Sequence, residues 1–242
     1  MKIKNLLVFA FIGLFAVACS QNSSNFGGSA KMKTQKDSAS YALGASIANN
    51  LSSRNGVQDL NYNAFVKGMK DVFEDQELKL EGAKQQTVIR SYLTALQNER
   101  SQKNLEEGQA FLEENKAKEE VQVTESGLQY KVIEEGKGAS PDANDTVRVH
   151  YTGTNIDEEI FDSSVERGEP VKFPVGRVIP GWTEGLQLMK EGAKYKFFIP
   201  SELAYGERAP RGGKIEPNQT LIFEVELLEV IPAEGTGEEA EK

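Results

Sequence analysis

The chain has 242 residues, which is enough for one large domain or two smaller ones. It carries 37 acidic and 28 basic side chains, a net charge of −9, and no basic patch with interleaved aromatics, so nucleic acid is not an expected partner. One histidine and one cysteine exclude a conventional metal site, and no cofactor is expected.

The N-terminus has the pattern of an export signal. Lys2 and Lys4 precede an apolar run over residues 6–18, which is about the length of a signal-peptide core and too short to span a bilayer. We therefore expect a signal peptide over residues 1–18. Residues 19–34 are rich in Ser, Asn, Gly and Gln, cannot bury a core, and are expected to form a flexible tether.

The only cysteine, Cys19, directly follows Ala16-Val17-Ala18, and two interpretations are open. Ordinary secretory cleavage after Ala18 would leave a free thiol at the new N-terminus. Alternatively, small residues before a cysteine resemble a bacterial lipoprotein signal with Cys19 as the lipidated residue, although Ala16 stands where such signals more often have Leu. We favour lipidation because an exported, unpaired thiol is unusual. The expected location is the bacterial envelope, periplasm or outer membrane, with the leaflet open.

Residues 35–80 are predicted to form two short helices. Asp37 and Ser38 are good caps for the first helix, and Asn63 for the second. Asn55-Gly56 is expected to end the first helix. Apolar residues recur at helical spacing in both helices. They are Leu43, Ile47 and Leu51 in the first helix, and Phe65, Met69, Val72 and Phe73 in the second. Helices of this size cannot bury such faces alone. They could pack on the rest of the chain, but we favour a homodimer.

Residues 81–120 contain no proline and are predicted to form one long connecting helix. Its first half has apolar anchors that end at Leu96, and residues 97–104 are polar all round. A continuous coiled coil is therefore disfavoured, and the pattern is typical of a helix that bridges domains in solvent. Gly108 is its expected weak point, because glycine costs up to about 1 kcal/mol relative to alanine in a helix.

Residues 121–232 are predicted to form an antiparallel β domain with one short helix, followed by a disordered acidic tail over 233–242. Strands are expected over 127–133, 147–153, 194–200 and 220–230, and helical spacing over 182–189. His150 alternates with Tyr151 on its strand and is expected to be structural. The fold class is α+β.

Aromatic residues of this domain come from several separate elements, and some carry polar tips beside one acid, Asp162. An ordinary core prefers Leu, Ile and Val, so the set predicts an apolar pocket that binds a ligand. The predicted pocket residues are Tyr151, Phe161, Asp162, Phe173, Val178, Ile179, Trp182, Tyr205, Ile215 and Phe223.

The runs VHYTG, FDSS, VIPGW, AYG and LIFEVELLEV, in this order and spacing, resemble the FKBP-type peptidyl-prolyl isomerases over about the last 110 residues. The resemblance implies an antiparallel sheet wrapped around a short helix, with the pocket between them. It implies an enzyme that acts on proline-containing or unfolded polypeptides, and macrolides as possible inhibitors. The charged loop over 207–216 departs from the family and leaves residue preference and macrolide affinity open.

The resemblance also implies roles for the pocket residues. Those expected to be catalytic are Tyr151, Phe161, Asp162, Trp182, Tyr205 and Phe223, and those expected to bind substrate are Phe173, Val178, Ile179 and Ile215. Trp182 would form the floor under the proline ring, and Ile179 N–H and Tyr205 O–H would donate hydrogen bonds to the ligand backbone. Asp162 would lie at the rim and is not assigned as a general base.

The N-terminal half resembles the dimeric, macrophage-infectivity-potentiator type of bacterial FKBP, in the runs Ser40–Gly44 and Phe65–Gly68. The expected function is a peptidyl-prolyl cis-trans isomerase that assists folding of exported proteins. Two alternatives stay open, a dimeric holdase chaperone and a surface-binding lipoprotein, in either of which the domain would dock clients without turnover.

Overall fold

The computed structural model describes residues 31–210 and 214–233. The expected signal peptide, Cys19, most of the tether and the expected tail beyond residue 233 lie outside the described residues. The chain divides into two compact units, one with residues up to 46 and 59–78, the other with residues 47–58 and from 79 onward. No helix in the described ranges has both the length and the apolar character needed to cross a bilayer.

The first two helices, α1 (Gln35–Asn55) and α2 (Tyr62–Phe73), begin earlier than their predicted caps. Thr34 Oγ1 accepts a hydrogen bond from Asp37 N at 3.1 Å, and Asn61 Oδ1 accepts one from Ala64 N at 3.1 Å. A cap side chain binds the N–H two or three residues further on, so Asn63 lies inside α2 and does not cap it. The predicted end of α1 at Asn55 is confirmed.

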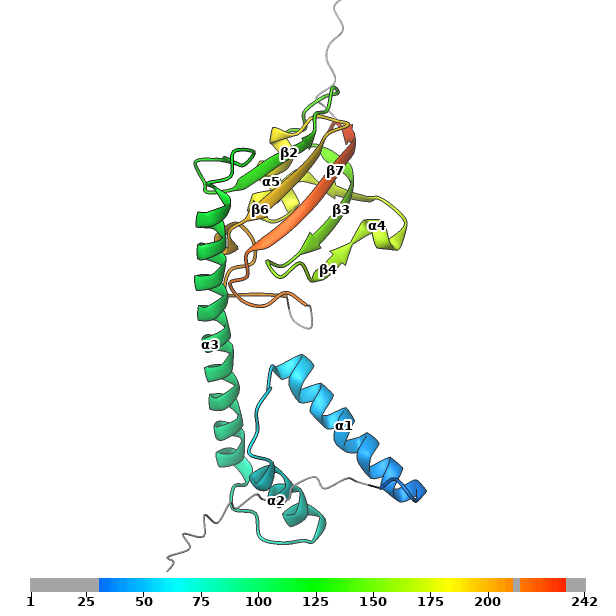
Figure 1. The fold of residues 1–242 in the computed structure, drawn as a ribbon, viewed down its shortest axis with the longest axis vertical. Helices are drawn as coiled ribbons and strands as arrows, with labels where there is room; N and C mark the ends of the chain where they lie inside the picture. The colour runs from blue at the N-terminus through cyan, green and yellow to red at the C-terminus, as the bar shows by residue number, and fades with distance from the viewer. Residues whose placement is uncertain (1–30, 211–213, 234–242) are drawn as a thin grey trace, which may run out of the picture. The chain divides into compact units, whose positions relative to one another are not determined.

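The larger unit contains one antiparallel sheet, in which neighbouring strands follow the order β1-β2-β6-β7-β3-β4, and β5 also pairs with β3 (Figure 1). Strand β7 is the longest, as predicted, and pairs with both β3 and β6. The strands are β1 (Gln122–Val123), β2 (Gln129–Glu134), β3 (Thr146–Thr154), β4 (Ile160–Ser163), β5 (Val171–Pro174), β6 (Lys194–Ile199) and β7 (Leu221–Ile231). The predicted α+β class is confirmed.

Two adjacent phenylalanines show that strand β6 is buried on both faces. Successive side chains of a strand point to opposite faces, so Phe197 and Phe198 of β6 enter different cores. Phe197 joins the main core, which also contains helix α5 (Pro180–Leu188). Phe198 and its cross-strand partner Ile222 form a smaller core on the other face.

Helix α5 lies against the sheet because two glycines face it. A Cβ on Gly181 would lie 2.5 Å from Ile199 Cγ2, and one on Gly185 would lie 2.7 Å from Phe197 Cε1. Both distances are far below van der Waals contact, so only hydrogen fits at these positions. The close approach buries the intervening face of α5, and with it Trp182, which is 4% exposed.

The long helix α3 (Gly82–Asn115) packs its last turns on the smaller core (Figure 1). Phe111 and Leu112 cover Phe198, and the ring centroids of Phe111 and Phe198 are 6.0 Å apart. The expectation that the helix bridges in solvent is therefore wrong for this part. Two buried amides complete the contact: Asn115 Nδ2 donates to Gln129 Oε1 at 2.9 Å, and Gln129 Nε2 donates to the Leu112 carbonyl at 2.9 Å.

Gly108 is buried on the same face of α3, where it lies against the isomerase domain. A Cβ at Gly108 would lie 2.4 Å from Oγ1 of Thr220, at the start of β7. The glycine costs helix propensity but permits the close approach of helix and sheet.

We predict that Gly185→Ala destabilises the domain. Alanine gains up to about 1 kcal/mol of helix propensity over glycine. Its Cβ would collide with the Phe197 ring, and overpacking a buried contact typically costs about 1–3 kcal/mol. The clash should win, which lowers the free energy of unfolding in a urea titration. Gln187→Ala, at an exposed position of the same helix, is the matched control and should change stability little. A more stable Gly185→Ala variant would contradict the packing described.

Candidate functional site

Trp182 is the centre of an aromatic cluster built from five elements. From its place on α5, its ring centroid lies 5.3 Å from that of Tyr151 on β3, 5.6 Å from Phe173 on β5 and 5.2 Å from Phe223 on β7. All three pairs are nearly perpendicular, at 79–89°, the edge-to-face geometry that aromatic rings favour. Phe161 on β4 packs in the same way on Phe223, with centroids 5.4 Å apart.

This cluster is the base of a cavity of about 700 Å³. The cavity is lined by all ten residues that the sequence predicts for a ligand pocket, although they span more than seventy positions of the chain. It is also lined by Arg177, Pro210 and Lys214, which the sequence reasoning missed. A concave, mostly apolar site of this size suits a peptide segment or a small organic ligand.

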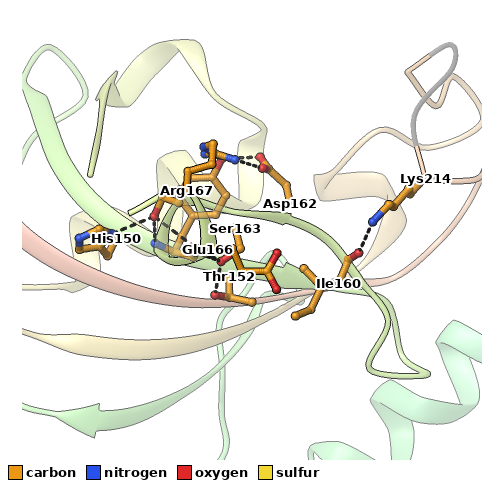
Figure 2. A network of polar contacts seen from close by, with 10 residues as sticks. His150, Thr152, Ile160, Asp162, Ser163, Glu166, Arg167 and Lys214 are labelled. Carbon is orange, nitrogen blue, oxygen red and sulfur yellow. Dashed lines mark hydrogen bonds and ion pairs between the residues drawn. The ribbon is translucent and has the colours of Figure 1, made fainter. Parts of the chain in front are cut away.

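One wall of the cavity carries a three-residue polar network. Tyr151 donates its hydroxyl hydrogen to Asp162, and Arg167 forms an ion pair with the other oxygen of the same carboxylate (Figure 2). Arg167 Nη2 also donates to the Tyr151 hydroxyl oxygen at 3.1 Å, and its guanidinium lies 5.7 Å from the Tyr151 ring centroid. Each member of the network therefore contacts the other two.

The network fixes the charge of Asp162. Burial alone would raise the pKa of this carboxyl, but hydrogen bonds from Tyr151 and Arg167 outweigh burial and lower the pKa below its usual value. Burial raises the pKa of Tyr151, and the hydrogen bond to Asp162 raises it further. At neutral pH the site therefore holds an ionised carboxylate and a neutral phenol.

Arg167 reaches the network through a short helix, α4 (Ser164–Arg167), whose N-cap is Ser163. Ser163 Oγ accepts a hydrogen bond from Glu166 N at 3.2 Å, and Ser164 Oγ accepts one from Tyr151 N at 2.8 Å. His150 Nδ1 lies 3.1 Å from the same Ser164 Oγ (Figure 2). His150 does not line the cavity. It helps to hold β3 against α4.

Tyr205 follows the 3₁₀ turn Ser201–Leu203. Its side chain lines the cavity, and the residue is 38% exposed. Burial raises the pKa of Tyr205, and the charge of Asp162 adds to the effect. The phenol therefore stays a hydrogen-bond donor at neutral pH.

Arg167 has no sequence signal that would have identified it, and for Lys214 the sequence shows only that it lies in the charged loop over 207–216. Lys214 Nζ donates to the Ile160 carbonyl at 3.0 Å, across 54 residues (Figure 2). Arg167 follows the FDSS run and becomes part of the site only because α4 turns it back toward Asp162. Both placements depend on tertiary structure.

The chemistry of the cavity is that of binding. Among the described residues, no group of three His, Cys, Asp or Glu side chains lies together as metal ligands would. The lining residues include no serine, cysteine or histidine nucleophile paired with a base. What the site offers is an apolar floor, an ionised carboxylate at one side and the phenol of Tyr205, since Tyr151 gives its hydroxyl hydrogen to Asp162.

Comparison with known proteins agrees with this description. A family model for the FKBP-type peptidyl-prolyl cis-trans isomerase matches residues 137–228. A second model, for the domain amino terminal to FKBP-type peptidyl-prolyl isomerase, matches residues 36–132.

Two curated relatives cover most of the chain. The FKBP-type 22 kDa peptidyl-prolyl cis-trans isomerase of Escherichia coli (strain K12) is 47% identical over 196 residues, which is 80% of this chain and 94% of that protein. The outer membrane protein MIP of Legionella longbeachae is 42% identical over 206 residues, 82% of this chain and 87% of that protein.

A solved structure extends the likeness to the fold. The crystal structure of FkpA from Escherichia coli matches with a TM-score of 0.64 at 38% identity, covering 83% of this chain and 99% of that one. The enzyme class predicted from the sequence motifs is confirmed: the chain belongs to the FKBP-type peptidyl-prolyl cis-trans isomerases.

Proposed function

We propose that the aromatic cavity around Trp182 binds the Xaa-Pro segment of a polypeptide and accelerates rotation about its peptide bond. The uncatalysed barrier is about 18–20 kcal/mol, because resonance gives the C–N bond partial double-bond character. A twisted amide has lost this resonance, and its carbonyl is less polar than that of the planar amide. An apolar cavity therefore disfavours the planar amide more than the twisted one, which is differential binding without a nucleophile.

The proposed roles follow from where the side chains lie. The proline ring rests on the Trp182 indole, between Tyr151, Phe173 and Phe223. Val178, Ile179, Phe161 and Ile215 complete the apolar enclosure. Ile179 N–H and Tyr205 O–H donate hydrogen bonds to the ligand backbone. The single observation that supports this proposal most is that these side chains, from separate elements, line one cavity.

Asp162 acts as a fixed charge and not as a base. Its carboxylate is held by Tyr151 and Arg167, and its lowered pKa makes it a poor proton acceptor. It orients the Tyr151 ring and places negative charge beside the rotating amide. Truncating Asp162 to alanine would remove the hydrogen-bond acceptor of both Tyr151 and Arg167.

We further propose that the N-terminal module forms a homodimer. Helix α1 leaves Leu43 66% and Ile47 39% exposed, one helical turn apart on the same face, and α2 leaves Phe73 81% exposed. Apolar side chains at helical spacing are rarely left in solvent, and a second copy of the chain offers the same faces in return. Two cavities on one dimer would then hold one unfolded client at raised effective concentration.

Export and lipidation at Cys19 belong to the same proposal. The signal-like segment and the position of Cys19 support them, and the Legionella relative is named an outer membrane protein. Folding of exported proteins is then the proposed task, with proline-containing polypeptides as clients. A holdase without turnover is the second candidate, and the exposed helices would favour it if the cavity proved inactive.

We predict that Asp162→Ala and Tyr205→Phe lower turnover of a proline-containing peptide without comparable loss of stability. Tyr205→Phe removes one neutral hydrogen bond, worth about two- to tenfold. Asp162→Ala removes a charged acceptor and should cost about tenfold or more. Asp157→Ala, at an exposed acid of the preceding turn, is the control. Unchanged kcat/KM in both variants would contradict the site assignment.

Lipidation predicts that the mature wild type partitions into membranes. Cys19→Ser should yield a soluble or unprocessed form, whereas Ser20→Ala should behave as wild type. Fractionation followed by mass measurement of the N-terminal peptide checks this. A wild type found entirely in the soluble fraction, with Cys19 as a free N-terminus, would rule lipidation out.

Dimerisation predicts that Leu43→Glu, which places a charge on the apolar face of α1, yields a monomer by mass in solution. Peptide turnover should stay within about twofold, because a short peptide needs only one cavity. Catalysis of a proline-limited refolding protein should fall about tenfold or more, since the second binding event is lost. Asn49→Glu, on the polar side of α1, is the matched control. A monomeric wild type would contradict the dimer.

A further inference from the structure

Ile215 enters the cavity from a loop that is held at both of its flanking residues. Lys214 Nζ donates to the Ile160 carbonyl of β4 at 3.0 Å (Figure 2). Glu216 forms an ion pair with Arg100 of helix α3, with Oε1 2.7 Å from Nη1. The aliphatic wall of the cavity is therefore fixed between the sheet on one side and α3 on the other.

Helix α3 makes further polar contacts with the same loop. Asn104 Nδ2 donates to the Pro217 carbonyl at 2.9 Å and approaches Glu216 Oε2 at 3.4 Å. Asn218 Nδ2 donates to Ser101 Oγ at 2.9 Å. We call these contacts of Arg100, Ser101 and Asn104 with residues 216–218 the brace.

The brace continues the buried stripe of α3. Partly or fully buried positions recur at helical spacing at Leu96, Arg100, Asn104, Gly108 and Leu112. The middle of this stripe is polar because it faces loop carbonyls and a carboxylate, and its end is apolar because it faces Phe198. Helix α3 thus touches the isomerase domain along one continuous line, from the cavity loop to the smaller core.

The small free energy expected of the Arg100–Glu216 ion pair indicates that the brace acts on the loop and not on the whole domain. The side chains of Arg100 and Glu216 are 33% and 35% exposed, and ion pairs of this kind contribute little to global stability. Their effect should fall on the loop itself, because the polar contacts of Lys214, Glu216 and Asn218 flank Ile215. A displacement of about 1 Å in a binding wall is enough to change turnover.

We propose that α3 positions Ile215 through the brace and thereby sets the preference of the cavity for the residue that precedes proline. The connecting helix is then part of the isomerase site as well as a spacer. This rests on the proposed function of the cavity. It assigns Arg100 and Asn104 as positioning residues, which act through Glu216, Pro217 and Ile215 and do not touch the substrate themselves.

The test uses the full chain with Arg100→Ala combined with Asn104→Ala. Two peptides that differ only in leucine or glutamate before proline serve as substrates. We expect kcat/KM for the better peptide to fall about two- to fivefold and the ratio between the peptides to shrink toward one. The thermal midpoint should hardly change, because partly exposed ion pairs contribute little to global stability, so the ratio between the peptides is the readout that a merely structural role would leave unmoved.

Amide hydrogen exchange measures directly how firmly the loop is held. The Glu216 amide donates to Gln219 Oε1 at 2.9 Å and the Asn218 amide to the Gly206 carbonyl at 2.8 Å. Both amides should exchange faster in the double variant. Lys103→Ala is the matched control, because Lys103 lies on the same helix, is 70% exposed and pairs with Glu107 of that helix at 3.7 Å. Arg100→Glu combined with Glu216→Arg should restore the peptide ratio that Arg100→Glu alone reduces.

Two results would overturn the inference. Unchanged exchange at Glu216 and Asn218 would show that α3 does not hold the loop. Faster exchange with an unchanged peptide ratio would show that the loop position does not set preference. Failure of the proposed function looks different, because the wild type would then turn over neither peptide, or Tyr205→Phe and Asp162→Ala would leave its turnover unchanged.

Discussion

The close packing of α5 on the sheet is the contact on which the site depends. Gly181 and Gly185 let the helix approach Ile199 and Phe197 so closely that no Cβ would fit. This approach carries Trp182 into the middle of the rings from β3, β5 and β7. The other face of β6 and β7 is covered by α3 at Phe198 and Ile222, so β6 has a buried side chain on each face. Strands packed on both sides support the base of the cavity.

The polar groups of the site are held by hydrogen bonds in fixed protonation states. This suits rotation about an amide bond, because that reaction needs no proton transfer. Asp162 is held by both Tyr151 and Arg167, and its pKa is lowered despite burial. Partial desolvation raises the pKa values of Tyr151 and Tyr205, so both phenols stay neutral; Tyr151 donates its hydroxyl hydrogen to Asp162, and Tyr205 lines the cavity. The arrangement gives fixed charge and hydrogen-bond donors around an apolar floor, which suits differential binding of a twisted amide.

The sequence predicts most of the isomerase fold, because its strands alternate and its aromatic motifs are dense. It predicts the ten residues that line the cavity, but not Arg167, whose place depends on the turn of α4. The caps at Thr34 and Asn61 were missed because several adjacent polar residues can serve as caps. The contact face of α3 was missed for another reason: hydrophobic periodicity cannot detect a stripe that is buried through Arg100, Asn104 and Gly108.

The pH dependence of peptide isomerisation tests the central claim, that the cavity works by binding without acid–base catalysis. The ordinary pKa values are about 3.9 for Asp and 10 for Tyr, and the shifts move Asp162 lower and both tyrosines higher. The account predicts a constant kcat/KM between about pH 7 and 9. It predicts a loss only below the pKa of Asp162, where the carboxylate is protonated, or at alkaline pH, where a phenol ionises. A kcat/KM that changes about tenfold per pH unit inside the neutral window would show a proton transfer in the rate-limiting step and contradict it.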